Sequence, residues 1–168
     1  MPQDRVEAAH FSPDIQEFIK LLHKHGVHYL IVGGEAVIFY GHARLTGDVD
    51  FFYDRREDNA RKLFRALDEF WAGDIPGIKD FIELMEAGLI LQFGRPPFRL
   101  DLINQIAGVT FDEAWPSKKE VTLVSEKEET PLYYLGLKQL IKNKEAAGRP
   151  KDLEDLAYLR RTAQYNDT

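Results

Sequence analysis

The sequence contains no cysteine, which excludes a disulfide framework, a zinc site built on thiolates and a cysteine nucleophile. It also lacks any apolar run close to the roughly 20 residues that a membrane-spanning helix requires. The segment from Met1 to His10 is polar and has no apolar core of the kind found in signal peptides. These absences predict a cytoplasmic protein without a membrane partner.

Positive charge is also scarce. The chain has 22 lysine and arginine residues against 28 aspartate and glutamate residues, a net charge of −6 and a pI near 5.4. Broad, nonspecific nucleic-acid binding needs an extended basic surface, so the composition argues against that function while allowing a small local basic patch. The length of 168 residues and the hydrophobic content of 44% suit a single domain with a sizeable core.

The spacing of apolar residues predicts alternating helices and strands in the first three quarters of the chain. Ser12 and Pro13 are typical of a helix start, and Gly26 is a natural end for that helix. Asp54 is expected to cap a further helix. Short apolar runs predict strands at residues 27–32, 49–53, 89–93, 98–103 and 121–124.

From Leu135 onward the apolar spacing becomes helical, and Gly148 and Pro150 separate two helices. We therefore expect an α/β (α+β) fold with a core over residues 1–128, which includes the N-terminal helix. A C-terminal helical segment over residues 129–168 should pack on this core.

Two aspartates and a glycine pair carry the clearest chemical signal. Gly33 and Gly34 follow one apolar stretch, and Asp48 and Asp50 begin the next. Residues two apart in a strand point to the same face, so both carboxylates share one face of a mostly apolar segment, where like charges repel. A divalent metal ion between them is the expected remedy.

Asp101 is a third acid, and it lies inside an otherwise mostly apolar strand, where aspartate is poorly favoured. Two explanations are open. Asp101 forms a salt bridge, with Arg99 or Arg44 as partner, or it faces Asp48 and Asp50 across neighbouring strands. Three converging carboxylates suit magnesium, and two such ions would clamp the attacking and leaving oxygens of a phosphoryl transfer.

Gly33 and Gly34 fit the same chemistry, since a backbone without side chains can approach a phosphate closely. Alone, a glycine pair is more often a plain tight turn. The aspartates that follow reverse that preference.

The order of these motifs resembles the nucleotidyltransferase superfamily of DNA polymerase β. The segment from Gly33 to Asp50, with Arg44-Leu45-Thr46-Gly47-Asp48, is similar to small bacterial nucleotidyltransferases near the abortive-infection toxin AbiE, and so is the run from Leu140 to Leu156. The resemblance implies a mixed sheet flanked by helices, with a C-terminal helical pair. It further implies two Mg²⁺ ions, for which Mn²⁺ can substitute, and a nucleoside triphosphate substrate.

The resemblance also gives roles to single residues. Asp48, Asp50 and Asp101 would bind the metal ions and form the catalytic set, with Asp101 helping to deprotonate the attacking hydroxyl. Gly33 and Gly34 would hold the nucleotide phosphates. The acceptor hydroxyl would belong to a tRNA 3′ end, a protein or a small molecule, and a cognate toxin or antitoxin would be a partner.

Three further residues are candidates for nucleotide binding. Arg44 either reaches phosphate or forms a structural ion pair, and Thr46 either shares a face with Asp48 or belongs to a turn. Lys144 lies on the apolar side of its helix, so it either reaches the triphosphate or extends past the edge of the core to solvent. Glu35, beside the glycines, is expected to stabilise a helix N-terminus.

Two other functions compete with nucleotidyl transfer. Asp48-Val49-Asp50 superficially fits the Asp-x-Asp motif of haloacid-dehalogenase-type phosphatases, but the neighbouring residues do not suit that motif. The second alternative is a catalytically inactive, partner-binding protein on the same scaffold. The presence of all three carboxylates speaks against it.

Overall fold

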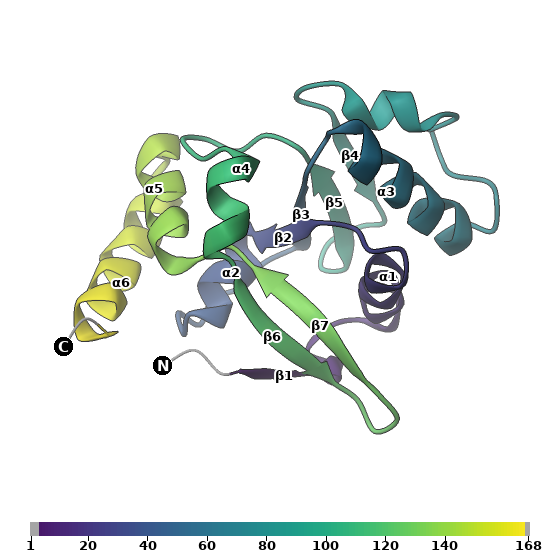
Figure 1. The fold of residues 1–168 in the computed structure, drawn as a ribbon. Coiled ribbons are helices and arrows are strands. Elements are labelled where there is room, and N and C mark those ends of the chain that lie inside the picture. Colours follow the sequence, from purple (N-terminus) through teal and green to yellow (C-terminus); the bar gives the residue numbers. More distant parts are fainter. Residues whose placement is uncertain (1–3, 167–168) are drawn as a thin grey trace.

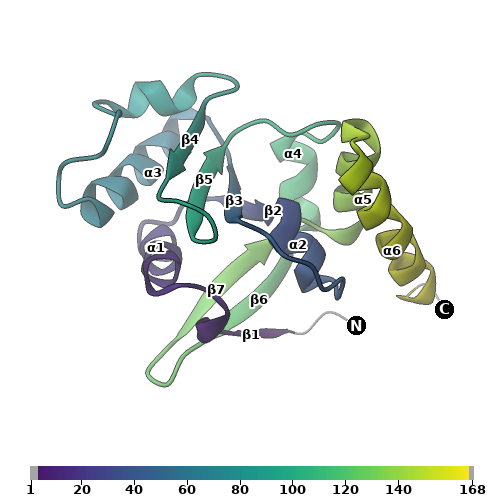
Figure 2. The same cartoon turned by 180° about the vertical axis from the view of Figure 1, so that it is seen from behind.

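The computed structural model describes residues 4–166 and contains a seven-stranded mixed sheet (Figures 1 and 2). The strand order is β1-β6-β7-β2-β3-β5-β4, with parallel pairs β1–β6, β7–β2 and β3–β5. The strands are β1 (Arg5–Glu7), β2 (Tyr29–Val32), β3 (Asp48–Tyr53), β4 (Ile90–Phe93), β5 (Arg99–Ile103), β6 (Lys119–Val124) and β7 (Glu129–Tyr134). The expected α+β class with a mixed sheet is therefore confirmed.

Helices flank the sheet, and both views place α1 beside α3 and α5 beside α6 at the other end of the molecule. The α-helices are α1 (Pro13–Lys24), α2 (Gly33–Phe39), α3 (Glu57–Phe70), α4 (Phe111–Ala114), α5 (Leu137–Ala147) and α6 (Pro150–Asn166), and the 3₁₀ helices are η1 (Ala8–His10), η2 (Phe81–Met85) and η3 (Trp115–Ser117). The last two α-helices form the expected C-terminal pair.

Strand β3 shows how alternation divides the core from the site. Phe51 points toward α1, where its ring meets Phe18 at 5.3 Å. Phe52 points to the opposite face and meets Phe111 of α4 at 5.2 Å. Asp48 and Asp50 share the face of Phe52 because side chains alternate along a strand. One face of β3 thus builds the core, and the start of the other face presents carboxylates.

The parallel register of β3 and β5 sets the positions of the charged residues on that face. Asp48 lies opposite Arg99, and Asp50 lies opposite Asp101. On the outer side of β5, Gln92 of β4 lies opposite Asp101. Residues far apart in the sequence therefore form one row of polar side chains across three strands.

Two expectations about local structure were wrong. Residues 129–134 were expected in a helical segment, but they form β7 between β6 and β2. Pro131 cannot donate a ladder hydrogen bond, yet β7 meets β2 only at Tyr134, so the proline is accommodated as on an edge strand. Asp54 was expected to cap a helix, but α3 begins later, after Arg56, whose backbone N–H donates to the Asp54 carboxylate at 3.0 Å.

Among the helices of residues 4–166, none combines the length and the apolar character that crossing a bilayer would require.

Candidate metal centre

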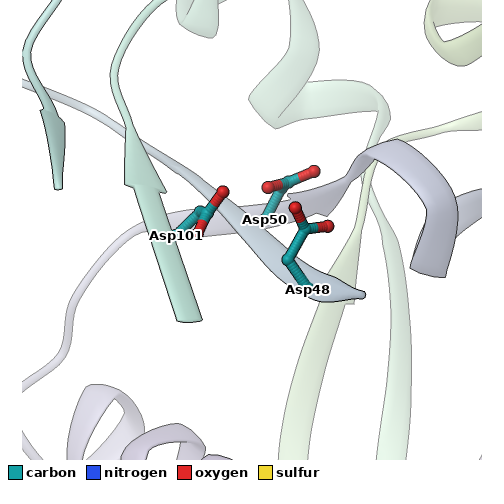
Figure 3. Close-up of side chains that lie close together, drawn as sticks. All are labelled: Asp48, Asp50 and Asp101. Carbon is teal, nitrogen blue, oxygen red and sulfur yellow. The ribbon is translucent and has the colours of Figure 1, made fainter. Parts of the chain in front are cut away.

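Three carboxylates converge on one face of the sheet (Figure 3). Asp48 and Asp50 extend from β3 and Asp101 from β5, and each offers an oxygen atom that lies within 4.8 Å of those of the other two. Within residues 4–166, this is the one group of three or more potential metal ligands that lie so close together. The second explanation for Asp101, that it faces Asp48 and Asp50, is confirmed.

The donor set suits a hard divalent cation, because all three groups are carboxylates and hard cations prefer oxygen ligands. Burial, the largest cause, and the neighbouring Asp48 and Asp101 carboxylates together raise the pKa of Asp50 to about 7. Burial and crowded negative charge therefore favour the protonated form of Asp50 up to a pH near neutral. A cation at this position would favour the charged form of Asp50.

Arg99 is the counter-ion that the protein itself supplies. Its guanidinium donates to Asp48 Oδ2 at 2.7 Å and to the two oxygens of Asp101 at 2.8 and 2.9 Å. The salt bridge that was offered as the first explanation for Asp101 is thus also present, with Arg99 as the partner. The two explanations are compatible because Arg99 and Asp101 share a strand face.

The two glycines have no room for side chains. Gly33 adopts a left-handed φ of +66°, and a Cβ atom there would collide with Asp50 Oδ2. At Gly34, a Cβ would lie 2.7 Å from Thr46 Oγ1 and 3.2 Å from a guanidinium nitrogen of Arg44. The glycine pair therefore lies directly beside both β3 and the loop that leads into it, and its backbone borders the carboxylates.

Thr46 and Arg44 both lie in that loop, and their contacts differ. The Thr46 hydroxyl donates to the Asp48 backbone oxygen at 3.2 Å and lies 3.4 Å from Asp48 Oδ1, so it orients a triad residue. Arg44 pairs with Asp155 of α6, Nε to Oδ1 at 3.2 Å. The structural ion pair proposed for Arg44 is present, and direct contact with phosphate stays a prediction.

Lys144 is buried, with 3% of its side chain exposed, and its amine pairs with Asp152 at 3.0 Å and Asp155 at 3.2 Å. The idea that Lys144 extends to solvent is therefore wrong. Its contact with a triphosphate stays a prediction. Burial alone would raise the pKa of Asp152, but Arg149 and Lys144 outweigh it and lower that pKa to about 2.

The sequence did not indicate how α6 reaches the site. Asp155 joins Lys144 to Arg44, and the Tyr158 ring stacks on His42 at 4.7 Å, where a Cβ at Gly41 would meet the Tyr158 hydroxyl. The available signal was the spacing of Asp152, Asp155 and Tyr158 on successive turns of one helix, which predicts a shared face. Nothing local identified the loop before β3 as its partner.

Glu35 lies in the first turn of α2, as expected, but it has a specific partner. Its carboxylate contacts His10 Nε2 at 2.7 Å and thereby raises the pKa of that imidazole. The contact ties the N-terminal η1 to α2, next to the glycine pair.

The three carboxylates do not line the cavity at the other end of β3. This cavity of about 630 Å³ lies at the carboxyl end of β3, with Phe52, Arg55, Asn104 and Phe111 in its wall. Asp48 and Asp50 lie at the opposite end of β3 and are half-buried, and Asp101 on β5 is buried.

The position of Asp48 argues against the phosphatase alternative. A haloacid-dehalogenase-type motif places its first aspartate at the end of an apolar strand, whereas Asp48 is the first residue of β3. No protein-family model matches this chain, and no curated protein matches it either.

Proposed function

We propose that this protein is a metal-dependent nucleotidyltransferase, which moves a nucleoside monophosphate from a nucleoside triphosphate to an acceptor hydroxyl. The observation that carries the proposal is the contact between the two halves of the site. Gly33 lies so close to Asp50 that a Cβ atom would collide with its carboxylate, and Asp101 joins Asp48 and Asp50 from the neighbouring strand. The backbone of Gly33 thus lies directly beside three potential metal ligands.

The residues of the site would have different roles in the proposed reaction. Asp48, Asp50 and Asp101 would hold two Mg²⁺ ions, which neutralise the triphosphate and stabilise charge on the attacking and leaving oxygens. The Gly33–Gly34 backbone carries no side chains and would form the near wall for the phosphate oxygens of the substrate. Thr46 orients Asp48, and Arg44 lies next to Gly34, where a guanidinium can pair with a phosphate oxygen.

The proposed transfer needs only the nucleoside triphosphate and the acceptor hydroxyl as reactants. The acceptor oxygen forms a bond to the α-phosphorus, the bond from that phosphorus to its bridging oxygen breaks, and pyrophosphate leaves. The proton of the acceptor hydroxyl passes to a carboxylate, for which Asp101 is the candidate by the resemblance. The acceptor would be an RNA 3′ end, a protein or a small molecule, and the resemblance favours a setting with a cognate toxin or antitoxin.

Labelling tests the proposal directly. The purified protein is incubated with each α-³²P-labelled nucleoside triphosphate, Mg²⁺ or Mn²⁺, and cell extract. We expect one labelled macromolecule or small product, and we expect Asp48→Asn to abolish it. Asp58→Asn, which makes the same chemical change at an exposed position of α3, should label normally. Absence of label with all four nucleotides and both metals would refute the proposed activity.

A further inference from the structure

Arg99 occupies the oxygens that a metal ion would need. Both oxygens of Asp101 accept hydrogen bonds from its guanidinium, and so does Asp48 Oδ2. The Asp101 Oδ2 atom also lies 3.4 Å from the Gln92 amide. Charge-assisted, forked hydrogen bonds of this kind are strong and directional. A carboxylate oxygen bonded in this way cannot at the same time present its lone pairs fully to a cation.

The position of Arg99 on β5 keeps its side chain beside the three carboxylates, whichever way the guanidinium points. Arg99 lies opposite Asp48 in the β3–β5 register and two residues before Asp101, so its stem is on the triad face. The Arg99 side chain also reaches solvent, because 27% of it is exposed while only 7% of the Asp101 side chain is. Displacement of the guanidinium would therefore take it toward solvent and not into the core.

From these contacts we propose that Arg99 is an internal cation that closes the metal site and must be displaced before a divalent ion binds Asp48 and Asp101. The proposal rests on the proposed function, because it takes the triad to be the metal site. Arg99 and the metal ion compete for the same oxygens, so Arg99 partly neutralises the metal-free site, and metal binding releases a guanidinium at the edge of the triad.

The released guanidinium would then be available to bind an anionic group. It remains tethered to β5, within the same row of side chains, and an anionic group brought to the site is its natural partner. Arg99 is therefore a positioning residue for phosphate as well as a competitor of the metal ion. The two roles predict opposite effects of one substitution, since removing Arg99 strengthens metal binding and weakens transfer.

Metal affinity without nucleotide is the decisive measurement. Electron paramagnetic resonance of free Mn²⁺ gives the dissociation constant for the full chain and for Arg99→Met. We expect Arg99→Met to bind Mn²⁺ at least about tenfold more tightly than the unaltered chain. Arg99→Lys keeps the charge but lacks the two parallel N–H donors of a guanidinium, so its Mn²⁺ affinity should lie between those of the other two. The Arg95→Met control removes the same charge at an exposed position nearby and should change the constant less than about twofold.

A second readout follows Arg99 itself. The Nε–H signal of Arg99 in a ¹⁵N correlation spectrum should shift as Mg²⁺ is added, with the same saturation curve as metal binding. Arg99→Lys covers the case in which Arg99→Met does not fold.

The outcomes separate the inference from the proposed function. Equal tightening in Arg99→Met and Arg95→Met, unchanged affinity, or weaker binding in Arg99→Met would each overturn the competition. Mn²⁺ binding that is the same in the unaltered chain and in Asp48→Asn would overturn both ideas, because the triad would then hold no metal. Competition as expected, with no nucleotide transferred, would refute the activity alone.

Discussion

At the scale of single residues, burial and the nearby Asp48 and Asp101 raise the pKa of Asp50 to about 7, against an ordinary value of 3.8. A group that holds its proton more tightly when folded makes the folded chain bind more protons than the unfolded one. The free energy of unfolding must then fall as the pH rises from about 4 to about 7. The free energy of unfolding of the metal-free protein is therefore lower at neutral and alkaline pH than at acidic pH, as far as Asp50 is concerned.

We expect Asp50→Asn to remove this pH dependence. Without metal, the variant should be more stable than the unaltered chain by roughly 1–3 kcal/mol at pH 8 and nearly equal to it at pH 4. Urea unfolding with a chelator present measures both values. The exposed Asp58→Asn control should gain no stability at pH 8; a gain equal to that of Asp50→Asn would contradict the assignment to the triad.

Two glycines with nearly the same positive φ allow the cost of backbone strain to be separated from the cost of a steric clash. Gly33 has φ +66° and Gly26 has φ +68°, but a Cβ atom collides with Asp50 only at Gly33 and meets nothing within 4 Å at Gly26. Gly26→Ala should cost about 1–2 kcal/mol of stability through backbone strain alone. Gly33→Ala should cost more and should also weaken Mn²⁺ binding. Similar losses of stability at the two positions would mean that the Asp50 side chain moves aside readily when position 33 carries a Cβ atom.

At the scale of elements, the C-terminal pair is joined to the site by a buried ion cluster. Lys144 of α5 contacts Asp152 and Asp155 of α6, and Asp155 continues to Arg44 in the loop before β3. Removing one member of a buried ionic group leaves the others without compensation, and this usually costs several kcal/mol. The cluster therefore sets the position of α6 and of the loop together.

Lys144→Met should lower the free energy of unfolding by about 3 kcal/mol. Lys138→Met, on the same helix but exposed, should change it by less than about 0.5 kcal/mol. Urea denaturation at pH 7 compares the two variants. A loss below about 1 kcal/mol in Lys144→Met would show that Arg44 and Arg149 neutralise the aspartates without it.

At the scale of the whole molecule, the sheet does not end where the helical segment was expected to begin. Strand β7 lies between β6 and β2, so it connects the β1–β6 edge to the strands that carry the triad. A chain that lacks residues 129–168 would therefore lose the middle of its sheet and not only two helices. Its remaining edges would expose unpaired backbone groups and part of the core.

We expect a chain ending at residue 128 to lack a cooperative thermal transition and to give poorly dispersed amide signals. A chain ending at residue 148 keeps all seven strands and should retain a dispersed spectrum at reduced stability, because Lys144 loses its partners on α6. Cooperative unfolding of the shorter chain would mean that the core over residues 1–128 folds by itself.

The sequence alone predicted the class of fold, most strands, the C-terminal helices and the three aspartates, because these depend on local spacing and on the cost of placing carboxylates in apolar strands. It could not predict β7, since Pro131 disfavours a strand until the neighbouring strands are known. The convergence of Asp101 with Asp48 and Asp50 could be anticipated but not decided. It depends on the β3–β5 register, and a shift of one residue would have sent Asp101 to the other face.

Only the tertiary structure decided the partners of the cations. Arg99, Arg44 and Lys144 carry the same charge on flexible stems, and nothing in their local sequence distinguishes a phosphate ligand from an ion pair. Packing does, because it places Arg99 on the triad and Lys144 among the carboxylates of α6. Local chemistry thus determined which residues bear charge, and long-range contacts determined which charges meet.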